Sequence, residues 1–291
     1  MDLYVAAFGF GLVTASILAI AAVGFTMQFG ITNILNLAYG DLMTAAAFVA
    51  YVMNQFGINI WIGIVGGGVF GAVASVVLNR WVYSPFLRRG TSPFGMVIVS
   101  LAMGLMIQNI LLGIGGPTAF SYQMDQGPNL RAGALILTAS QVGIMVISVA
   151  AMVAIFLLLT RTRLGKAMRA SAANAPLARS CGIRTDRVTD VVWAVSGALC
   201  GVAGVVLVMN TASFTAITGS TFLVVIIAVA VLGGVGQPNG AMLGALVVGL
   251  ATELGAIVIA PSYKDVIAFA ILVLVLLVRP QGILSLARAS T

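Results

Sequence analysis

Charged residues are scarce in this sequence: only 7% of its 291 residues are Asp, Glu, Lys or Arg. A soluble domain carries about 25% charged residues, so this chain lacks the means to cover a water-exposed surface of ordinary size. Hydrophobic residues make up 61% of the chain, and the mean hydropathy is +1.14. The composition excludes an ordinary soluble protein and predicts a chain that lies mostly in a membrane.

Histidine is absent, and the two cysteines, Cys181 and Cys200, are too few for a disulfide framework or a metal cluster. Gly165-Lys166 is followed by alanine, so there is no Walker A motif, and neither a nucleophile elbow nor HExxH occurs. We therefore expect no catalytic residues, no metal, no cofactor and no ATP hydrolysis by this chain itself. An intramembrane enzyme, which would need paired carboxylates or histidine, is the least favoured hypothesis.

Apolar runs occupy most of the sequence. They lie at roughly 5–27, 40–55, 60–82, 94–115, 140–160, 188–209, 220–236, 240–260 and 264–279. A crossing helix needs roughly 20 mostly apolar residues, so the length allows about eight to ten crossings. The runs are continuous and do not alternate, which favours helices over membrane β-strands. We predict an all-α polytopic bundle, with residues 1–291 as one transmembrane domain and the short runs 40–55 and 220–236 as partial or re-entrant crossings.

The net charge of +7 is concentrated in a few loops. Basic residues cluster at 80–89, at 161–187 and in the C-terminal tail, where Arg279 and Arg288 lie. The positive-inside rule places these three regions in the cytoplasm and the segments 116–139 and 210–220, with Asp125 and Arg131, on the other side. The charge thus indicates membrane orientation and not nucleic-acid binding.

The two halves of the chain share a spacing of glycines. Gly40 and Gly57 are as far apart as Gly219 and Gly236, and each pair flanks a short apolar run that a longer glycine-bearing run follows. The second short run comes five spans after the first, and this odd step would give the two halves opposite orientations. We therefore predict an inverted repeat, the arrangement of many transporters.

Several polar residues lie in or beside the apolar runs. We list them as candidates for a substrate path: Asn33, Asn36, Tyr39, Asp41, Gln108, Asn109, Asn210, Thr215 and Glu253. Polar groups in a membrane are costly and often functional, but asparagines and hydroxyls also join helices by hydrogen bonds. Both readings remain open, with the carboxylates Asp41 and Glu253 as the stronger functional candidates.

The loop 161–187 has the composition of two short helices. Good helix formers occupy 167–175 and 177–181, Pro176 suits the first turn of the second helix, and Gly182 suits its end. Small residues at Ala172, Ala175, Ala178 and Cys181 would form one face. Because alanines bury little area in lipid, we expect this segment to contact a protein partner and not only the membrane surface.

Motifs in order along nearly the whole chain resemble a known family. They are Gly30 to Leu42 (GITNILNLAYGDL), Arg163 to Ala170 (RLGKAMRA) with 178–183, Leu232 to Ala241 (LGGVGQPNGA) with Gly244, Gly249 and Glu253, then Lys264-Asp265 and Leu276 to Ile283 (LLVRPQGI). The sequence is similar to permeases of branched-chain amino acid ABC importers, more to the LivH-type subunit than to its longer partner permease. One departure is that Tyr39 and Asp41 flank Gly40 where the family often has His and Glu.

The resemblance implies a type II-like importer permease of the bacterial inner membrane, without enzyme activity or bound cofactor. Its partners would be a second homologous permease, two ATP-binding subunits on the cytoplasmic face and a periplasmic amino-acid-binding protein. The ATPase-coupling residues would be Arg169, Ala172, Ala175, Ala178, Gly182 and Ile183. Two alternatives remain: a urea or short-amide permease of the same family, and a proton-coupled secondary transporter that uses Glu253 or Asp41.

Overall fold

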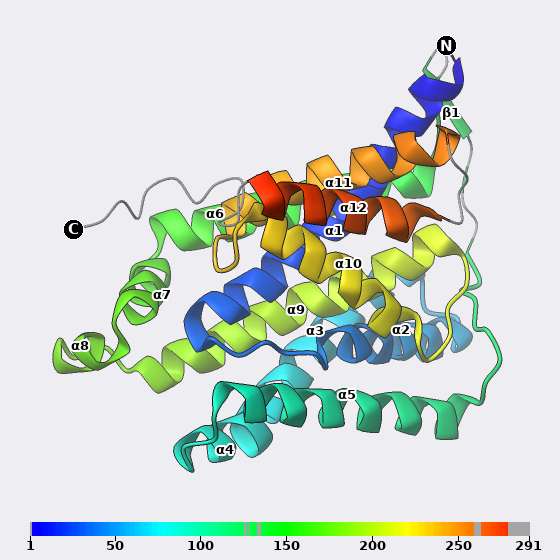
Figure 1. Ribbon diagram of the computed structural model, residues 1–291. Coiled ribbons are helices and arrows are strands. Elements are labelled where there is room, and N and C mark those ends of the chain that lie inside the picture. Colours follow the sequence, from blue (N-terminus) through cyan, green and yellow to red (C-terminus); the bar gives the residue numbers. More distant parts are fainter. Residues whose placement is uncertain (1, 125–126, 128, 133–134, 259–262, 279–291) are drawn as a thin grey trace. The chain divides into compact units, whose positions relative to one another are not determined.

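A computed structural model describes residues 2–124, 127, 129–132, 135–258 and 263–278, and these residues are mainly helical (Figure 1). The elements are α1 (Asp2–Thr32), α2 (Tyr39–Gln55), α3 (Ile60–Leu78), the π-helix η1 (Asn79–Tyr83), α4 (Ser84–Arg88), α5 (Pro93–Gly115), β1 (Asn129–Ala132), β2 (Leu135–Thr138), α6 (Ala139–Arg161), α7 (Arg163–Ala173), α8 (Ala175–Ser180), α9 (Thr185–Thr211), α10 (Thr218–Gly233), α11 (Pro238–Val258) and α12 (Lys264–Val278).

Six helical stretches among the described residues are long and apolar enough to cross a membrane: Tyr4–Thr32, Ile60–Arg88, Pro93–Gly115, Ala139–Arg161, Thr185–Thr211 and Pro238–Ile257. The short runs predicted at 40–55 and 220–236 are the helices α2, with 17 residues, and α10, with 16. The predicted all-α polytopic fold is confirmed. Arg279, Arg288 and Asp125 lie outside the described residues, as do the ends of the runs 240–260 and 264–279.

One element was not predicted. The segment 116–139 contains an antiparallel hairpin in which Asn129 pairs with Thr138 and Ala132 with Leu135. Each strand has only four residues, too few to give an alternating pattern that stands out among apolar neighbours.

The chain divides into two compact units, with 1–26, 125–152 and 224–291 in the first and 27–124 and 153–223 in the second. In the second unit α2, α3 and α9 pack together, and α5 lies against α2 (Figure 1). The contact between α3 and α9 is backbone to backbone, since a Cβ atom on Gly71 would overlap the carbonyl oxygen of Gly197. Small residues at such crossings let membrane helices approach closely.

The first unit contains most of α1 together with α11 and α12. Helices α11 and α12 are in contact, and Gly249 of α11 lies against the backbone of Ala15 in α1. Glu253 and Lys264, treated below, belong to this unit.

Several local features recur in the two halves at one constant offset along the chain, as the predicted repeat requires, while the inverted repeat itself stays a prediction. Helix α1 ends at Thr32 and α9 at Thr211, and each is followed by a non-glycine residue with positive φ, Asn33 at 52° and Ala212 at 62°. The next helices, α2 and α10, begin at Tyr39 and Thr218.

The glycines that suggested the repeat keep the same correspondence. Gly57 and Gly236 both have positive φ, 80° and 86°. Gly40 contacts its own counterpart, because a Cβ on either Gly40 or Gly219 would overlap the carbonyl oxygen of the other. The first turns of the two repeat-related short helices therefore meet, while their opposite orientation stays a prediction.

Candidate functional site

The loop 161–187 forms the two predicted helices. Thr162 caps α7, its Oγ1 accepting a hydrogen bond from the backbone N–H of Gly165 at 3.1 Å and donating to the carbonyl of Leu158 at 2.5 Å. Arg169 donates a hydrogen bond to the carbonyl of Leu159 at the end of α6. A cation at a helix C-terminus is favourable, so Arg169 fixes α7 to α6.

The inner face of α7 packs on three other helices. Met168 is 1% exposed and forms a cluster with Met27 of α1 and with Val188 and Val192 of α9. Leu158 of α6 packs against the same cluster. The cluster therefore joins α7 to the ends of α1, α6 and α9.

Helix α8 follows with the predicted boundaries. Asn174 caps it through a 3.0 Å hydrogen bond from the backbone N–H of Leu177, Pro176 lies in its first turn, and Gly182 has φ of 84°. The left-handed conformation at Gly182 closes the helix end.

The small face expected on this segment is not a free surface as a whole. Ala178 is only 4% exposed because it is covered by the chain itself, and Ala175 is half-buried, while Ala172 and Cys181 are exposed. The large apolar side chain that α8 presents is Leu177, at 61% exposure. Sequence reasoning missed Leu177, although an exposed leucine on a short helix is a plausible anchor for a partner.

Arg179 ties α8 to the beginning of α9. Its Nε donates to Thr185 Oγ1 at 2.6 Å, and its Nη2 lies 3.4 Å from the carboxylate of Asp186. The charged groups of the second pair are exposed, so it contributes little to stability.

A polar groove of about 880 Å³ lies beside these residues, in the second unit. Its lining comes from two regions that the charge pattern placed on the same side of the membrane: Asn79, Arg80, Ser84, Pro85, Leu87 and Arg88 from one, and Arg179, Asp186, Thr189 and Asp190 from the other. Arg80 is held by Asp190, whereas Arg88 forms no ion pair among the described residues. This groove and α7–α8 together form the candidate coupling surface.

The polar segment 33–41 is held mainly inside the second unit. Asn33 is exposed, but Asn36, Tyr39 and Asp41 are 2%, 1% and 5% exposed. The Tyr39 hydroxyl donates to the carbonyl of Ser196 at 3.5 Å. Asn36 Nδ2 and Asp41 Oδ1 are buried without a hydrogen-bond partner among the residues that the structure describes. Buried polar atoms of this kind are costly and mark the segment as a candidate for rearrangement.

The segments 116–124 and 210–220, predicted on the opposite side of the membrane, contact each other. Phe120 and Phe214 exchange two backbone hydrogen bonds, at 2.8 and 2.9 Å. The Tyr122 hydroxyl donates to the carbonyl of Ala47 at 3.0 Å, and burial raises the pKa of Tyr122, so the phenol stays protonated. The pairing agrees with the common side that the charge pattern predicts for these two segments.

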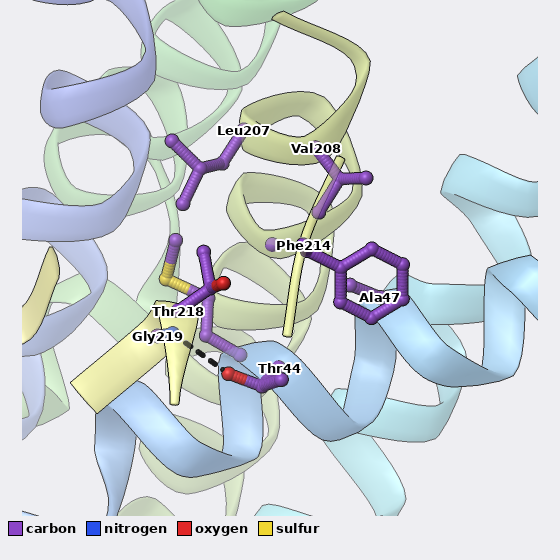
Figure 2. A pocket seen from close by; sticks show the side chains of 9 residues that line it. Thr44, Ala47, Leu207, Val208, Phe214, Thr218 and Gly219 are labelled. Carbon is purple, nitrogen blue, oxygen red and sulfur yellow. Dashed lines mark hydrogen bonds between the residues drawn. The ribbon is translucent and has the colours of Figure 1, made fainter. Parts of the chain in front are cut away.

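A small cavity lies where α2, α9 and the start of α10 meet. Figure 2 shows Leu207 and Val208 on α9, Phe214 after it, and Thr44 of α2 accepting a 2.8 Å hydrogen bond from the N–H of Gly219. The volume is about 10 Å³, room for about one water molecule. An amino acid therefore has no room here in this conformation.

The remaining candidates for a substrate path do not line this cavity. Thr215 is half-buried and its hydroxyl lies 3.3 Å from that of Thr218, so it stabilises the start of α10. Asn210, in the last turn of α9, is half-buried. On α5, Gln108 is half-buried, and the exposed Asn109 donates back to the carbonyl of Leu105 at 2.7 Å. A path-lining role for these residues stays a prediction.

Glu253 belongs to the first unit and is an ion-pair partner. Its two carboxylate oxygens accept from Lys264 Nζ at 2.7 and 2.8 Å, and Thr14 Oγ1 donates to it at 3.0 Å. The side chain is 13% exposed, so the pair compensates a charge that is largely buried. Sequence reasoning noted Lys264 in a motif but assigned it no role, because a pair between two helices leaves no local pattern.

The architecture is that of a multi-pass helical membrane protein. The family model for the branched-chain amino acid transport system / permease component matches residues 7–276, and the chain belongs to that family. It is 31% identical to the high-affinity branched-chain amino acid transport system permease protein LivH of Escherichia coli strain K12, over 94% of this chain and 93% of the relative. It is 30% identical to BraD of Pseudomonas aeruginosa, with the same coverage.

One solved structure has a similar fold. The chain matches one from PsaBC of Streptococcus pneumoniae, determined in complex with a Fab, with a TM-score of 0.53. The match covers 94% of this chain and 91% of that one at 14% identity. The likeness concerns the fold alone.

Proposed function

We propose that this chain is the membrane-spanning subunit of an ABC importer that carries branched-chain, hydrophobic amino acids across the bacterial inner membrane. The observation that carries the proposal is the family match over residues 7–276, joined to a helical segment, α7–α8, packed on the ends of three spans. Relatives described as branched-chain amino acid permeases support this substrate class over urea and short amides.

The partners are a second homologous permease, two ATP-binding subunits and a periplasmic amino-acid-binding protein. The ATPases dock on the candidate coupling surface, where Leu177 and the basic residues around α7–α8 are exposed. ATP is bound by those subunits. Their closure displaces α7–α8, and the Met168 cluster passes the displacement to the spans.

The translocation path opens only when the spans rearrange, because the cavity beside Gly219 is too small for an amino acid. A ligand or an ATPase shifts such an equilibrium only through different affinities for the two states. The amino acid delivered by the binding protein would favour one of the two states of the permease. ATP bound on the other side of the membrane would favour the other state.

A docking test uses Leu177→Asp in the chain coexpressed with candidate partner ATPases from the same organism. Removing an exposed anchor and adding a charge should weaken ATPase copurification by on the order of tenfold or more, as at interface hot spots. Leu177→Met is the matched control and should retain binding. Undiminished copurification of the Leu177→Asp variant would refute docking at α8.

The proton-coupled alternative is less favoured at Glu253, because the carboxylate of Glu253 is held by Lys264 and Thr14. Asp41 remains as its candidate. Uptake that persists without the ATPases but stops when the proton gradient is dissipated would favour that alternative.

A further inference from the structure

The helix that begins at Ile60 changes its winding at Asn79, where the π-helix η1 connects α3 to α4. Short π-helical turns inside α-helices are rare and occur frequently at functional sites. This one lies beside the coupling groove, since Asn79 and Arg80 are part of the groove lining.

The first end of η1 is fixed to α9 by Asp190. One carboxylate oxygen accepts from Asn79 Nδ2 at 2.9 Å, and the other accepts from Arg80 Nε at 3.0 Å and Nη2 at 2.8 Å. Two-pronged contacts of this kind fix geometry as well as contributing energy. Asp190 lies in the second turn of α9, and α9 follows α8 after the turn at Gly182.

The other end of η1 reaches the linker between α1 and α2. Tyr83 is fully buried, and its hydroxyl donates to Asn36 Oδ1 at 2.8 Å. Its ring packs against Trp193, with 4.9 Å between ring centroids. Asp190 and Trp193 are three residues apart on α9 and thus share one face of it, and this face contacts η1 at both ends.

The linker itself is a tightly held segment. Asn33 has φ of 52°, a left-handed conformation that asparagine tolerates better than most other non-glycine residues. The hydroxyl of Ser100 in α5 forms two hydrogen bonds with the linker. It donates to the carbonyl of Leu35 and accepts from the N–H of Leu37, both at 3.1 Å. Asn36 Nδ2 lacks a hydrogen-bond partner among the described residues, so the linker gains a bond if it moves to meet an acceptor.

We propose that Arg80, Tyr83 and Asp190 are positioning residues for transport. Displacement of α8 and the start of α9 by the ATPases moves η1 through Asp190, and η1 moves the 33–38 linker through the Tyr83–Asn36 hydrogen bond. This inference rests on the proposed function and adds to it the route between the coupling surface and the linker.

The test uses the full importer reconstituted in liposomes, with amino-acid uptake and ATP hydrolysis measured on the same preparation. Tyr83→Phe removes the hydroxyl but keeps the ring against Trp193, and Tyr4→Phe, at an exposed position, is the matched control. We expect uptake per ATP hydrolysed to fall by about fivefold or more in Tyr83→Phe, the lower range of allosteric coupling effects. Complex assembly and the rate of ATP hydrolysis should be retained, and Tyr4→Phe should match the unaltered chain.

The ion pair is tested with Asp190→Asn, Arg80→Gln and the exchange of the two charges, Arg80→Asp with Asp190→Arg. Each single change should lower uptake per ATP, and the exchange should restore part of it. A cycle of Tyr83→Phe with Asn36→Ala should be non-additive, because both changes break the same bond.

An unchanged uptake-to-ATP ratio in well-assembled Tyr83→Phe importer would overturn the inference. So would a lower thermal stability with the ratio retained, which would make Tyr83 a packing residue only. If the unaltered importer shows no ATP-driven uptake, both the proposed function and this inference fail. If the unaltered importer works and its Tyr83→Phe variant remains fully coupled, only this inference fails.

Discussion

At the scale of single residues, Glu253 illustrates what a buried charge requires. Its carboxylate accepts hydrogen bonds from Lys264 Nζ and from the Thr14 hydroxyl. These contacts join α11 to α12 and to α1. A pair of this kind leaves a largely buried charge when one partner is removed. Glu253 therefore contributes to the stability of the first unit whatever else it does.

Lys264→Met should lower the free energy of unfolding by about 1–3 kcal/mol, because the carboxylate loses a charged hydrogen-bond donor. Thermal unfolding of the purified protein in detergent measures this. The double variant Lys264→Met with Glu253→Gln should recover part of the loss, since the unpaired charge is gone. Equal stability of Lys264→Met and the unaltered protein would show that the ion pair makes no net contribution to stability.

At the scale of elements, the short helices α2 and α10 meet through Gly40 and Gly219, which are counterparts in the repeat. The apolar runs and the glycine spacing predicted both helices and their correspondence. They did not predict that the two glycines contact each other, because that contact joins positions far apart in the chain.

Gly219→Ala should destabilise the protein by about 1–3 kcal/mol, because a Cβ there overlaps the backbone of Gly40 and overpacking has this typical cost. Gly113→Ala on α5 is the control, since a Cβ there meets nothing within 4 Å. In a helix that control substitution should be neutral or slightly stabilising. Melting temperatures of the two variants in one detergent decide the matter, and equal values would contradict the close approach.

The coupling segment shows the same limits of sequence reasoning. Pro176 and Gly182 predicted where α8 begins and ends, because helix ends are encoded locally. Burial of Ala178 was not predictable, since it depends on what α8 packs against. The π-helix η1 and the contacts of Asp190 likewise depend on side chains from another helix.

At the scale of the whole molecule, this chain belongs to a permease family, and ATP-driven amino-acid import is a property of the assembly that we propose around it. The composition predicted the membrane class, and ordered motifs along nearly the whole chain predicted the family. The substrate path is the part that sequence and fold predict least. Asn36, Tyr39 and Asp41 are buried in this conformation, so a path-lining role for them stays a prediction that would require rearrangement.

The most direct measurement is leucine uptake into liposomes that contain this chain with the proposed partner permease and ATPases. The ATP is supplied on the side of α7–α8 and the binding protein on the other. We predict uptake that requires both ATP and the binding protein, is unaffected when the proton gradient is dissipated, and is lost in Leu177→Asp. Uptake that follows the proton gradient without ATPases, or that accepts urea but not leucine, would contradict the proposed function.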